Sequence, residues 1–357
     1  MEYSLELPIN NVSFGQVSTA LLREVKGRDL DPCVFPIGKL DLGTQKKDED
    51  FEKWLSKNII KAPSTHSRKN TNIKLWHLNN SLNSVSEEQI LFTFYELDSP
   101  TKTELNIAKN NRLVTSSKYA QQVFDSCGVS SDYVPLGFDS FNFHRIEKQY
   151  FEDDRIVFNL CGKFEKRKHH QKIIQSWIKK FGLNKKYFLQ CAIFNPFISN
   201  EDNEKIHRQL TGNNYIFNVN FVGFMPNNEL YNDFLNSGDV IIGMSGGEGW
   251  GLPEFQSTAL GKHSVILNAH SYKDWATNEN SVLVDPSGKI EAYDGMFFQK
   301  DNEYNQGNIF DWNEDDFISA CEEAIKKVES NKLNEEGVKL QKDFTYSKTL
   351  DKLLELV

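Results

Sequence analysis

The sequence predicts an α/β protein made of two domains. Its 357 residues exceed what a single hydrophobic core comfortably fills, and they suit two domains of ordinary size. In the second half, β-branched and aromatic runs alternate with runs that have helical periodicity. This alternation predicts a parallel, doubly wound sheet with helices on both of its faces.

The first domain is expected over residues 1–148, as a mixture of strands and helices. Helices are expected at STALLREV, Thr103–Asn110 and Ser117–Cys127, where apolar residues recur at helical spacing. Residues 41–72 are polar and rich in lysine, so they are expected to form a surface excursion. The predicted strands are the apolar runs SLELPI, NIKLWHL and ILFTFYEL.

The second domain is expected over residues 149–337, after the connecting stretch PLGFDSFNFHRIEKQY. Its predicted strands are RIVFNLCG, KYFLQCAIF, YIFNVNFVGF, DVIIGMS and HSVILNA. Its predicted helices are His170–Phe181, NNELYNDFLNSG and LPEFQSTALG. Residues 338–357 are expected to form a terminal amphipathic helix. Since ligands of parallel sheets bind at the carboxyl ends of strands, the loops after RIVFNLCG and DVIIGMS are the candidate binding loops.

Composition narrows the class of protein. The net charge of −9 argues against general affinity for nucleic acid or for an anionic membrane. The N-terminal residues do not form a secretory signal, and no apolar run approaches 18 residues, so stable membrane insertion is not expected. Five scattered cysteines without a CxxC pair fit free thiols in a reducing cytosol, and we expect a cytoplasmic protein.

The stretch Ser245–Gln256, SGGEGWGLPEFQ, holds four glycines around one carboxylate. Glycines allow backbone N–H groups to approach a ligand closely, and Pro253 suits the first turn of a helix. Trp250–Leu252 would then lie at a helix N-terminus, which attracts phosphate. Glu248 would be repelled by a diphosphate, so hydrogen bonding to sugar hydroxyls is its natural task. Taken alone, the stretch also suits an ordinary turn before a surface helix.

The larger pattern resembles the retaining glycosyltransferases of GT-B fold, specifically glycosyltransferase family four. EGWGLPEFQSTALGKHSVI is similar to the signature of that family, and CGKFEKRKHHQKIIQSW is similar to its basic element. The resemblance covers residues from about 110 to 350, in the family's order and spacing. It implies two Rossmann-like domains facing a cleft, a nucleotide-sugar donor on the second domain, and a terminal helix that packs back on the first.

The resemblance also implies roles for individual residues. Lys163 and Lys168 would face the diphosphate of the donor and act with Glu248 in catalysis, and Arg167 is an alternative to either lysine. A lysine run alone would more often be a solvated surface. The remaining donor contacts would come from Gly15, Gly249, Trp250, Gly251, Leu252 and Gln256.

Gln256 is a departure from the family pattern. The family has a second glutamate eight positions after the first, where it usually binds the ribose of the nucleotide. Gln256 can still accept and donate a hydrogen bond, but without charge-assisted strength. We expect weaker donor binding or a changed donor preference, and a degenerate enzyme is the alternative. Glu254 is expected to face elsewhere on the helix.

Three residues of the first domain are candidates for the acceptor side. His77, Glu96 and Asp98 are placed near the ends of predicted strands, where family members often carry polar residues. A structural hydrogen bond is at least as good an explanation for each. The acceptor itself stays open among a glycan, a lipid, a protein and a modified nucleobase. The triplet Asp29–Asp31 follows a helix, so no metal site is expected there and no cofactor is predicted.

The sequence therefore favours a metal-independent, retaining hexosyl- or pentosyltransferase that uses a nucleotide sugar. Two alternatives stay open at this point. Gln256 motivates a non-catalytic module that binds sugar nucleotides, and a nucleotide-sugar epimerase is another enzyme class on the same fold.

Overall fold

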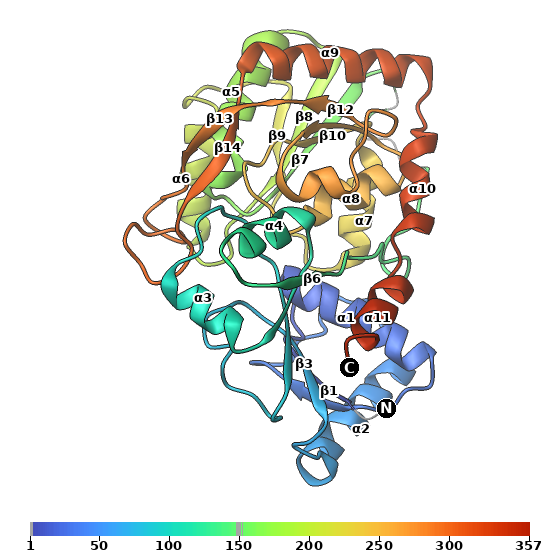
Figure 1. Ribbon diagram of the computed structural model, residues 1–357. Helices are drawn as coiled ribbons and strands as arrows, with labels where there is room; N and C mark the ends of the chain where they lie inside the picture. The colour runs from blue at the N-terminus through green and yellow to red at the C-terminus, as the bar shows by residue number, and fades with distance from the viewer. Residues whose placement is uncertain (1–2, 148–150, 152) are drawn as a thin grey trace.

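The computed structural model describes residues 3–147, 151 and 153–357. The predicted boundary between residues 148 and 149 lies outside these described residues. Within them, the chain forms two six-stranded parallel sheets and one small antiparallel pair. The two sheets lie one above the other in Figure 1, with helices around each.

The first sheet has the strand order β2-β1-β3-β4-β5-β6. Its strands are β1 (Tyr3–Leu7), β2 (Cys33–Pro36), β3 (Thr71–Leu75), β4 (Gln89–Thr93), β5 (Arg112–Thr115) and β6 (Ser131–Tyr133). Its helices are α1 (Ser13–Gly27), α2 (Glu49–Thr65), α3 (Lys102–Lys109) and α4 (Lys118–Ser126). The order reverses between β1 and β3, which makes this pair the topological switch point of the sheet.

The second sheet has the order β12-β11-β10-β7-β8-β9, which is the dinucleotide-fold order read from the other edge. Its strands are β7 (Ile156–Gly162), β8 (Tyr187–Ile193), β9 (Val219–Phe221), β10 (Val240–Gly243), β11 (His263–Leu267) and β12 (Val282–Val284). Its helices are η1 (Lys166–Lys168), α5 (His170–Phe181), α6 (Asn200–Leu210), α7 (Asn228–Ser237), α8 (Leu252–Ala259), η2 (His270–Asp274) and α9 (Glu314–Ser330). The switch point lies between β7 and β10.

The prediction of a surface excursion over residues 41–72 was wrong, because α2 occupies most of it. Asp48 caps the helix by accepting a hydrogen bond from the N–H of Phe51. Phe51 and Leu55 are buried in the core of the first half and are spaced one helical turn apart. The stripe is narrow among many lysines, so the overall polarity of the segment concealed it.

The terminal segment forms two helices rather than the single predicted one, namely α10 (Glu335–Asp343) and α11 (Tyr346–Leu354). Thr345 separates them, because its side chain accepts a hydrogen bond from the N–H of Lys348 and starts a new helix. α11 lies against α1 in the first half, and Figure 1 shows this return. An ion pair of 2.6 Å between Arg28 and Asp351 connects the two helices.

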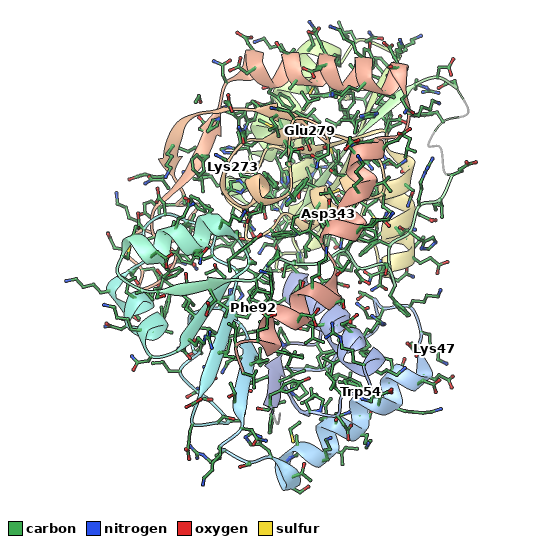
Figure 2. All side chains as sticks on the ribbon, turned by 45° about the vertical axis from the view of Figure 1, so that its right-hand side comes forward. Lys47, Trp54, Phe92, Lys273, Glu279 and Asp343 are labelled. Atoms are coloured by element: carbon green, nitrogen blue, oxygen red, sulfur yellow. The ribbon has the colours of Figure 1, made fainter. Side chains whose placement is uncertain are left out.

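Each sheet buries a continuous apolar core. Phe92 lies inside the first half, whereas Lys47, Lys273 and Glu279 lie at the surface (Figure 2). A hairpin of β13 (Pro286–Glu291) and β14 (Asn308–Trp312) extends from the second half towards the first. Its residues Ala292, Phe298 and Ile309 are buried in a core that belongs mainly to the first half. The two halves are therefore joined by shared core as well as by the connecting chain.

Candidate active site at the strand switch point

The residues with the strongest sequence signal meet at the switch point of the second sheet. The loop after β7 carries the basic element, and the loop after β10 carries Glu248. Because β7 and β10 are hydrogen-bonded neighbours, their carboxyl ends bring the two loops together. The distant segments CGKFEKRK and SGGEGWG thus become one site.

Arg167 is the centre of this site. Its Nε lies 2.6 Å from an oxygen of Glu165, its Nη1 lies 2.9 Å from Glu248, and its Nη2 lies 3.2 Å from Glu96. Nη1 also donates a hydrogen bond of 2.7 Å to the carbonyl of Gly247. Arg167 is 8% exposed, so it links three carboxylates in a nearly dry environment.

The two lysines lie on either side of Arg167. Lys168 is buried and forms an ion pair with the same oxygen of Glu248 that Arg167 contacts. Lys163 is more exposed, and its Nζ lies 2.5 Å from Glu165 and 3.7 Å from the ring centre of Phe297. The predicted donor cations are therefore brought together, and each already has a carboxylate partner.

Burial and these partners set the protonation of the acids. Burial alone would raise the pKa of Glu248, but Arg167 and Lys168 hold it well below its usual range. Desolvation raises the pKa of Glu96 to about 7 against the attraction of Arg167, and the charges of Glu248 and Glu165 add to the rise. Glu248 is ionised near neutral pH, whereas Glu96 titrates there.

Glu254 was expected to face elsewhere on the helix, and the structure corrects this. Its side chain fits beside Gly243 at the end of β10, just as the stem of Lys168 fits beside Gly162 at the end of β7. A Cβ built on either glycine would contact the charged side chain, at 2.7 Å for Gly243 and 3.3 Å for Gly162. Two glycines at neighbouring strand ends thus leave room for a buried acid and a buried cation.

Glu254 has an unusual environment for a carboxylate. It is 2% exposed, and its Oε2 has no hydrogen-bond partner within the residues that the structure describes. Burial raises its pKa to about 7, Lys168 opposes the rise, and Glu248 adds to it. Sequence reasoning also missed Glu165, although it is the only acid in the basic run FEKRK and that isolation was a usable signal.

The glycines of the loop also permit close packing, which the sequence did not indicate. Protein atoms occupy the positions that side chains would take at these glycines. A Cβ atom added at Gly246 would lie 2.3 Å from the carbonyl oxygen of Phe310, and one added at Gly247 would lie 2.8 Å from that of Glu96. At Gly249 it would lie 2.6 Å from Cβ of Phe94, and at Gly251 it would lie 2.2 Å from the ring of Tyr272. The loop is clamped between the first half and β14, because only glycine permits such close approach.

The start of α8 nevertheless keeps free donors. Within the described residues, the backbone N–H groups of Gly249, Trp250, Gly251 and Leu252 donate no hydrogen bond. The first three of these residues are buried. The first N–H groups of a helix have no partner within the helix, and such a row at the start of α8 is suited to an acceptor ligand such as phosphate.

Gln256 faces away from Glu254, because two residues turn a helix by about 200°. It is 6% exposed, and its amide takes part in no side-chain hydrogen bond in the described part of the chain. The side chain of Trp250 packs instead in the core against Phe255 and Phe344, at ring distances of 5.5 and 5.4 Å. Trp250 therefore has only its backbone to offer to a donor.

Among the other predicted residues, Gly15 lies within α1 and is buried. A Cβ there would lie 2.2 Å from the carbonyl of Asn10, so the glycine is required by the tight turn into the helix. Asp98 anchors the hairpin, since it pairs with Lys289 at 2.9 Å and accepts a hydrogen bond from the N–H of Asn308. Asp98 is thus engaged with the hairpin, whereas Glu96 contacts Arg167 directly.

His77 is exposed at the carboxyl end of β3, and its ring lies 4.4 Å from that of Phe14. Desolvation lowers the pKa of His77, and the charge of Lys163 lowers it further. His77 is therefore neutral at pH 7 and lies within electrostatic range of the charged cluster.

Asp31 of the triplet Asp29–Asp31 pairs with Lys57 and Lys61, at 3.1 and 2.8 Å. No group of three or more histidines, cysteines, aspartates or glutamates in the described residues is arranged to hold a metal ion. Likewise, none of the helices formed by those residues is both long and apolar enough to cross a membrane.

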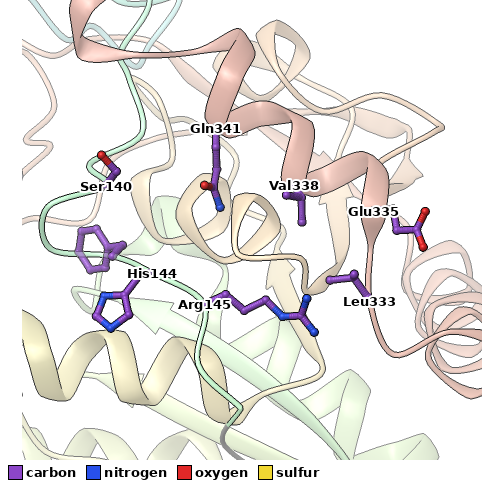
Figure 3. A pocket seen from close by; sticks show the side chains of 8 residues that line it. Ser140, His144, Arg145, Leu333, Glu335, Val338 and Gln341 are labelled. Carbon is purple, nitrogen blue, oxygen red and sulfur yellow. The ribbon is translucent and has the colours of Figure 1, made fainter.

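A cavity of about 450 Å³ lies away from the charged cluster, between the connecting segment and α10. Figure 3 shows that the side chains of His144, Arg145 and Gln341 border it. It lies where the two halves are joined, because the N–H of His144 donates to Asn232 and that of Ile146 donates to Asn236. It shares no residue with the predicted donor site.

Comparison with known proteins places this geometry in context. No protein-family model matches the chain. A protein of Sulfolobus islandicus rod-shaped virus 1, named as an uncharacterized glycosyltransferase, is 27% identical over 200 residues. These residues are 51% of this chain and 55% of that protein, so the similarity spans about half the length of the curated relative.

Several solved structures share the whole arrangement. Sucrose-phosphate synthase from Thermosynechococcus elongatus superposes with a TM-score of 0.68 and 12% identity over 100% of this chain and 98% of that one. HepE of Anabaena, solved in complex with UDP, superposes with a TM-score of 0.65 and 13% sequence identity. The match covers 100% of this chain and 99% of HepE. WaaG, a glycosyltransferase of lipopolysaccharide biosynthesis, superposes with a TM-score of 0.62 and 9% sequence identity over 99% of both chains. At these identities the likeness concerns the fold, and with the two doubly wound parallel sheets it establishes that this chain has the GT-B fold.

Proposed function

We propose that this protein is a retaining glycosyltransferase that moves a sugar from a nucleotide-sugar donor to an acceptor hydroxyl. The observation that carries the proposal is the row of unpaired N–H groups from Gly249 to Leu252, beside two buried cations at a strand switch point. A diphosphate has the charge and the acceptor oxygens to satisfy both. The glycosyltransferase name of the viral relative and the UDP complex of HepE support the same ligand class.

In this proposal, Lys163, Arg167 and Lys168 bind the diphosphate, and Glu248 binds hydroxyls of the transferred sugar. Each cation has a carboxylate partner in the structure, so a bound diphosphate would replace part of these ion pairs. The first half would also have to move, because Glu96 and Phe94 contact the glycine loop. Gln256 would contact the ribose through its neutral amide.

The chemistry needs only these groups. The bond between the anomeric carbon and the phosphate oxygen breaks, the acceptor oxygen bonds to the same carbon, and the departing phosphate takes the acceptor proton. Negative charge grows on the leaving nucleotide, and fixed cations with helix-end N–H groups stabilise it. We propose that these cations make a metal ion unnecessary, and undiminished transfer in excess EDTA is the expected result.

The first experiment is a thermal-shift screen of UDP-, GDP-, ADP- and dTDP-sugars. A donor that binds only the folded state raises the free energy of unfolding by RT ln(1 + [L]/Kd), and the melting temperature rises as a result. The anomeric configuration of the product is then read by NMR. Retention supports the proposal, whereas inversion of the glycosidic configuration contradicts the retaining assignment.

The second experiment replaces Glu248 by Gln, which keeps the volume and removes the charge. We expect transfer to fall by about 100-fold or more, because the acid that orients the sugar is lost. Asp239→Asn is the matched control, since Asp239 lies at the opposite end of β10 and binds the N–H of Val157. Full activity of Glu248→Gln would refute the role of this acid.

A second candidate function is a non-catalytic module that binds sugar nucleotides. It is favoured by Gln256 and by the carboxylate partners that neutralise the three cations. Nucleotide binding without turnover, across a broad acceptor screen, would support this alternative. A nucleotide-sugar epimerase would instead invert a carbon of the donor sugar in the absence of any acceptor.

A further inference from the structure

The switch point of the first sheet forms a second surface with its own chemistry. It lies between β1 and β3, and its loops are Pro8–Val12 after β1 and the segment that begins at Trp76 after β3. Ligands of open parallel sheets bind at such points. The proposed donor cluster occupies the corresponding place of the second sheet, so this surface is the counterpart on the first half.

An aromatic group underlies the surface. The ring of Phe14 lies 4.4 Å from His77 and 4.3 Å from Phe94, and the ring of Trp76 lies 5.4 Å from His77. His77 is exposed and Trp76 is half-buried. Phe94 also contacts Gly249, the neighbour of Glu248, so the aromatic group adjoins the proposed donor cluster.

The loops around the aromatic group carry no charge. Neither Pro8–Gly15 nor Trp76–Ser86 contains Lys, Arg, Asp or Glu. Apart from His77, their exposed polar residues are amides and a hydroxyl, namely Asn11, Ser13, Asn79, Asn80 and Asn83. Charged residues do lie next to these loops. Lys163 and Glu96 are engaged in ion pairs of the donor cluster, whereas Lys39 and Asp41 follow β2 and are exposed, and the N–H of Asp41 donates to the carbonyl of Ile9. His77 adds a neutral imidazole with one donor and one acceptor.

Under the proposed function the acceptor lies on the first half, and we infer that it is a neutral saccharide held by this surface. The inference rests on the proposed function, and it selects one of the acceptor classes that the sequence left open. A sugar ring has an apolar C–H face that fits an aromatic surface, and its hydroxyls pair with neutral amides and with imidazole. A phosphorylated lipid or a nucleic acid needs cations for its phosphates, and these two loops provide none.

The test uses the donor found by the thermal-shift screen, together with lactose, maltose, cellobiose and chitobiose as neutral probes. Glucose 6-phosphate, a polyprenyl phosphate, a peptide and an oligonucleotide are the competing acceptors. We expect transfer to at least one neutral saccharide. We also expect saturation-transfer NMR to detect that saccharide on the nucleotide-bound protein.

His77→Ala and Trp76→Ala are expected to raise the acceptor KM by tenfold or more and to change donor affinity by less than twofold. His144→Ala is the matched control, because His144 is exposed near the connecting segment, outside both sites. Failure of every neutral saccharide to bind, or transfer confined to a charged acceptor or a peptide, would overturn the inference. Failure of the proposed function shows separately, as the lack of stabilisation by any nucleotide sugar.

Discussion

The two switch points of this molecule occupy corresponding places in their parallel sheets but differ in side-chain chemistry. At the second sheet, three cations and four carboxylates gather at the carboxyl ends of β7 and β10, and most of them are buried. Glu165 and Glu248 come from the two loops, Glu254 comes from α8, and Glu96 comes from the first half. At the first sheet, the loops after β1 and β3 hold aromatic, aliphatic, amide, hydroxyl and imidazole groups and no Lys, Arg, Asp or Glu. A sheet edge therefore positions a ligand, whereas the loop residues decide which ligand it is.

The charged switch point depends on both halves of the chain. Glu96 comes from the first half and reaches Arg167, and the carbonyl of Gly249 accepts a hydrogen bond of 2.7 Å from Ser116. The hairpin adds Phe310, whose carbonyl lies 2.8 Å from Nε2 of His169. A buried charge cluster needs partners on all sides, which explains why the halves meet closely here.

The largest expected effect comes from Arg167→Ala. It leaves Glu165, Glu248 and Glu96 without their shared cation, and breaking a buried pair typically costs about 3–5 kcal/mol of unfolding free energy. Denaturant unfolding measures this loss, and Arg167→Lys should lose less. A change below about 1 kcal/mol would mean that the cluster is better solvated than its burial indicates.

Glu254→Gln is expected to stabilise the protein in a pH-dependent manner. The pKa of Glu254 is about 7 in the fold, above its ordinary value of 4.5. As pH rises between these values, the unfolded chain releases the proton while the folded chain retains it, so stability falls. The loss of unfolding free energy is on the order of 3 kcal/mol and is complete above pH 7.

The unfolding free energies of Glu254→Gln and the parent chain should therefore converge near pH 4.5 and differ most near pH 8. The groups facing Glu254 are Lys168, Glu248 and Tyr272. Tyr272→Phe is the control, because it removes a neighbouring hydroxyl without removing a charge that titrates in this range. A constant difference at every pH would show that only volume and packing changed.

Gln256→Glu is expected to retain or improve nucleotide affinity, by at most about tenfold. A carboxylate makes stronger hydrogen bonds to ribose hydroxyls than an amide does. Titration with the free nucleotide diphosphate measures this effect apart from the acceptor. A large loss of affinity would indicate that the neutral amide serves another contact, and it would weaken the comparison with the neutral surface.

Lys289→Ala is the smallest change that tests how the halves are held together. Its ion pair with Asp98 is partly exposed, so we expect the free energy of unfolding to fall by about 1 kcal/mol or less. Asp98 would keep its hydrogen bond from the N–H of Asn308. Unfolding measurements with Lys180→Ala as a control for a surface pair would reveal any larger role of the hairpin.

Local sequence determined the elements with clear periodicity and the residues that follow them. The helix His170–Phe181 and the loop between β10 and α8 were predicted because apolar spacing and glycines act over short distances. The GT-B fold was predicted from the resemblance to a known family, which is spread over many such segments, and not from periodicity. α2 was missed, because its few apolar residues are masked by lysines and acids.

Only the tertiary structure decided how the site residues are paired. Nothing in the sequence indicated that Glu96 reaches Arg167, that Glu254 shares the surroundings of Lys168, or that Phe94 and Phe310 clamp the glycine loop. These contacts join residues more than 60 positions apart, and a buried charge acquires its partners only when the chain has folded. Sequence therefore determined which chemical groups are present, and packing of the two halves decided which of them face one another.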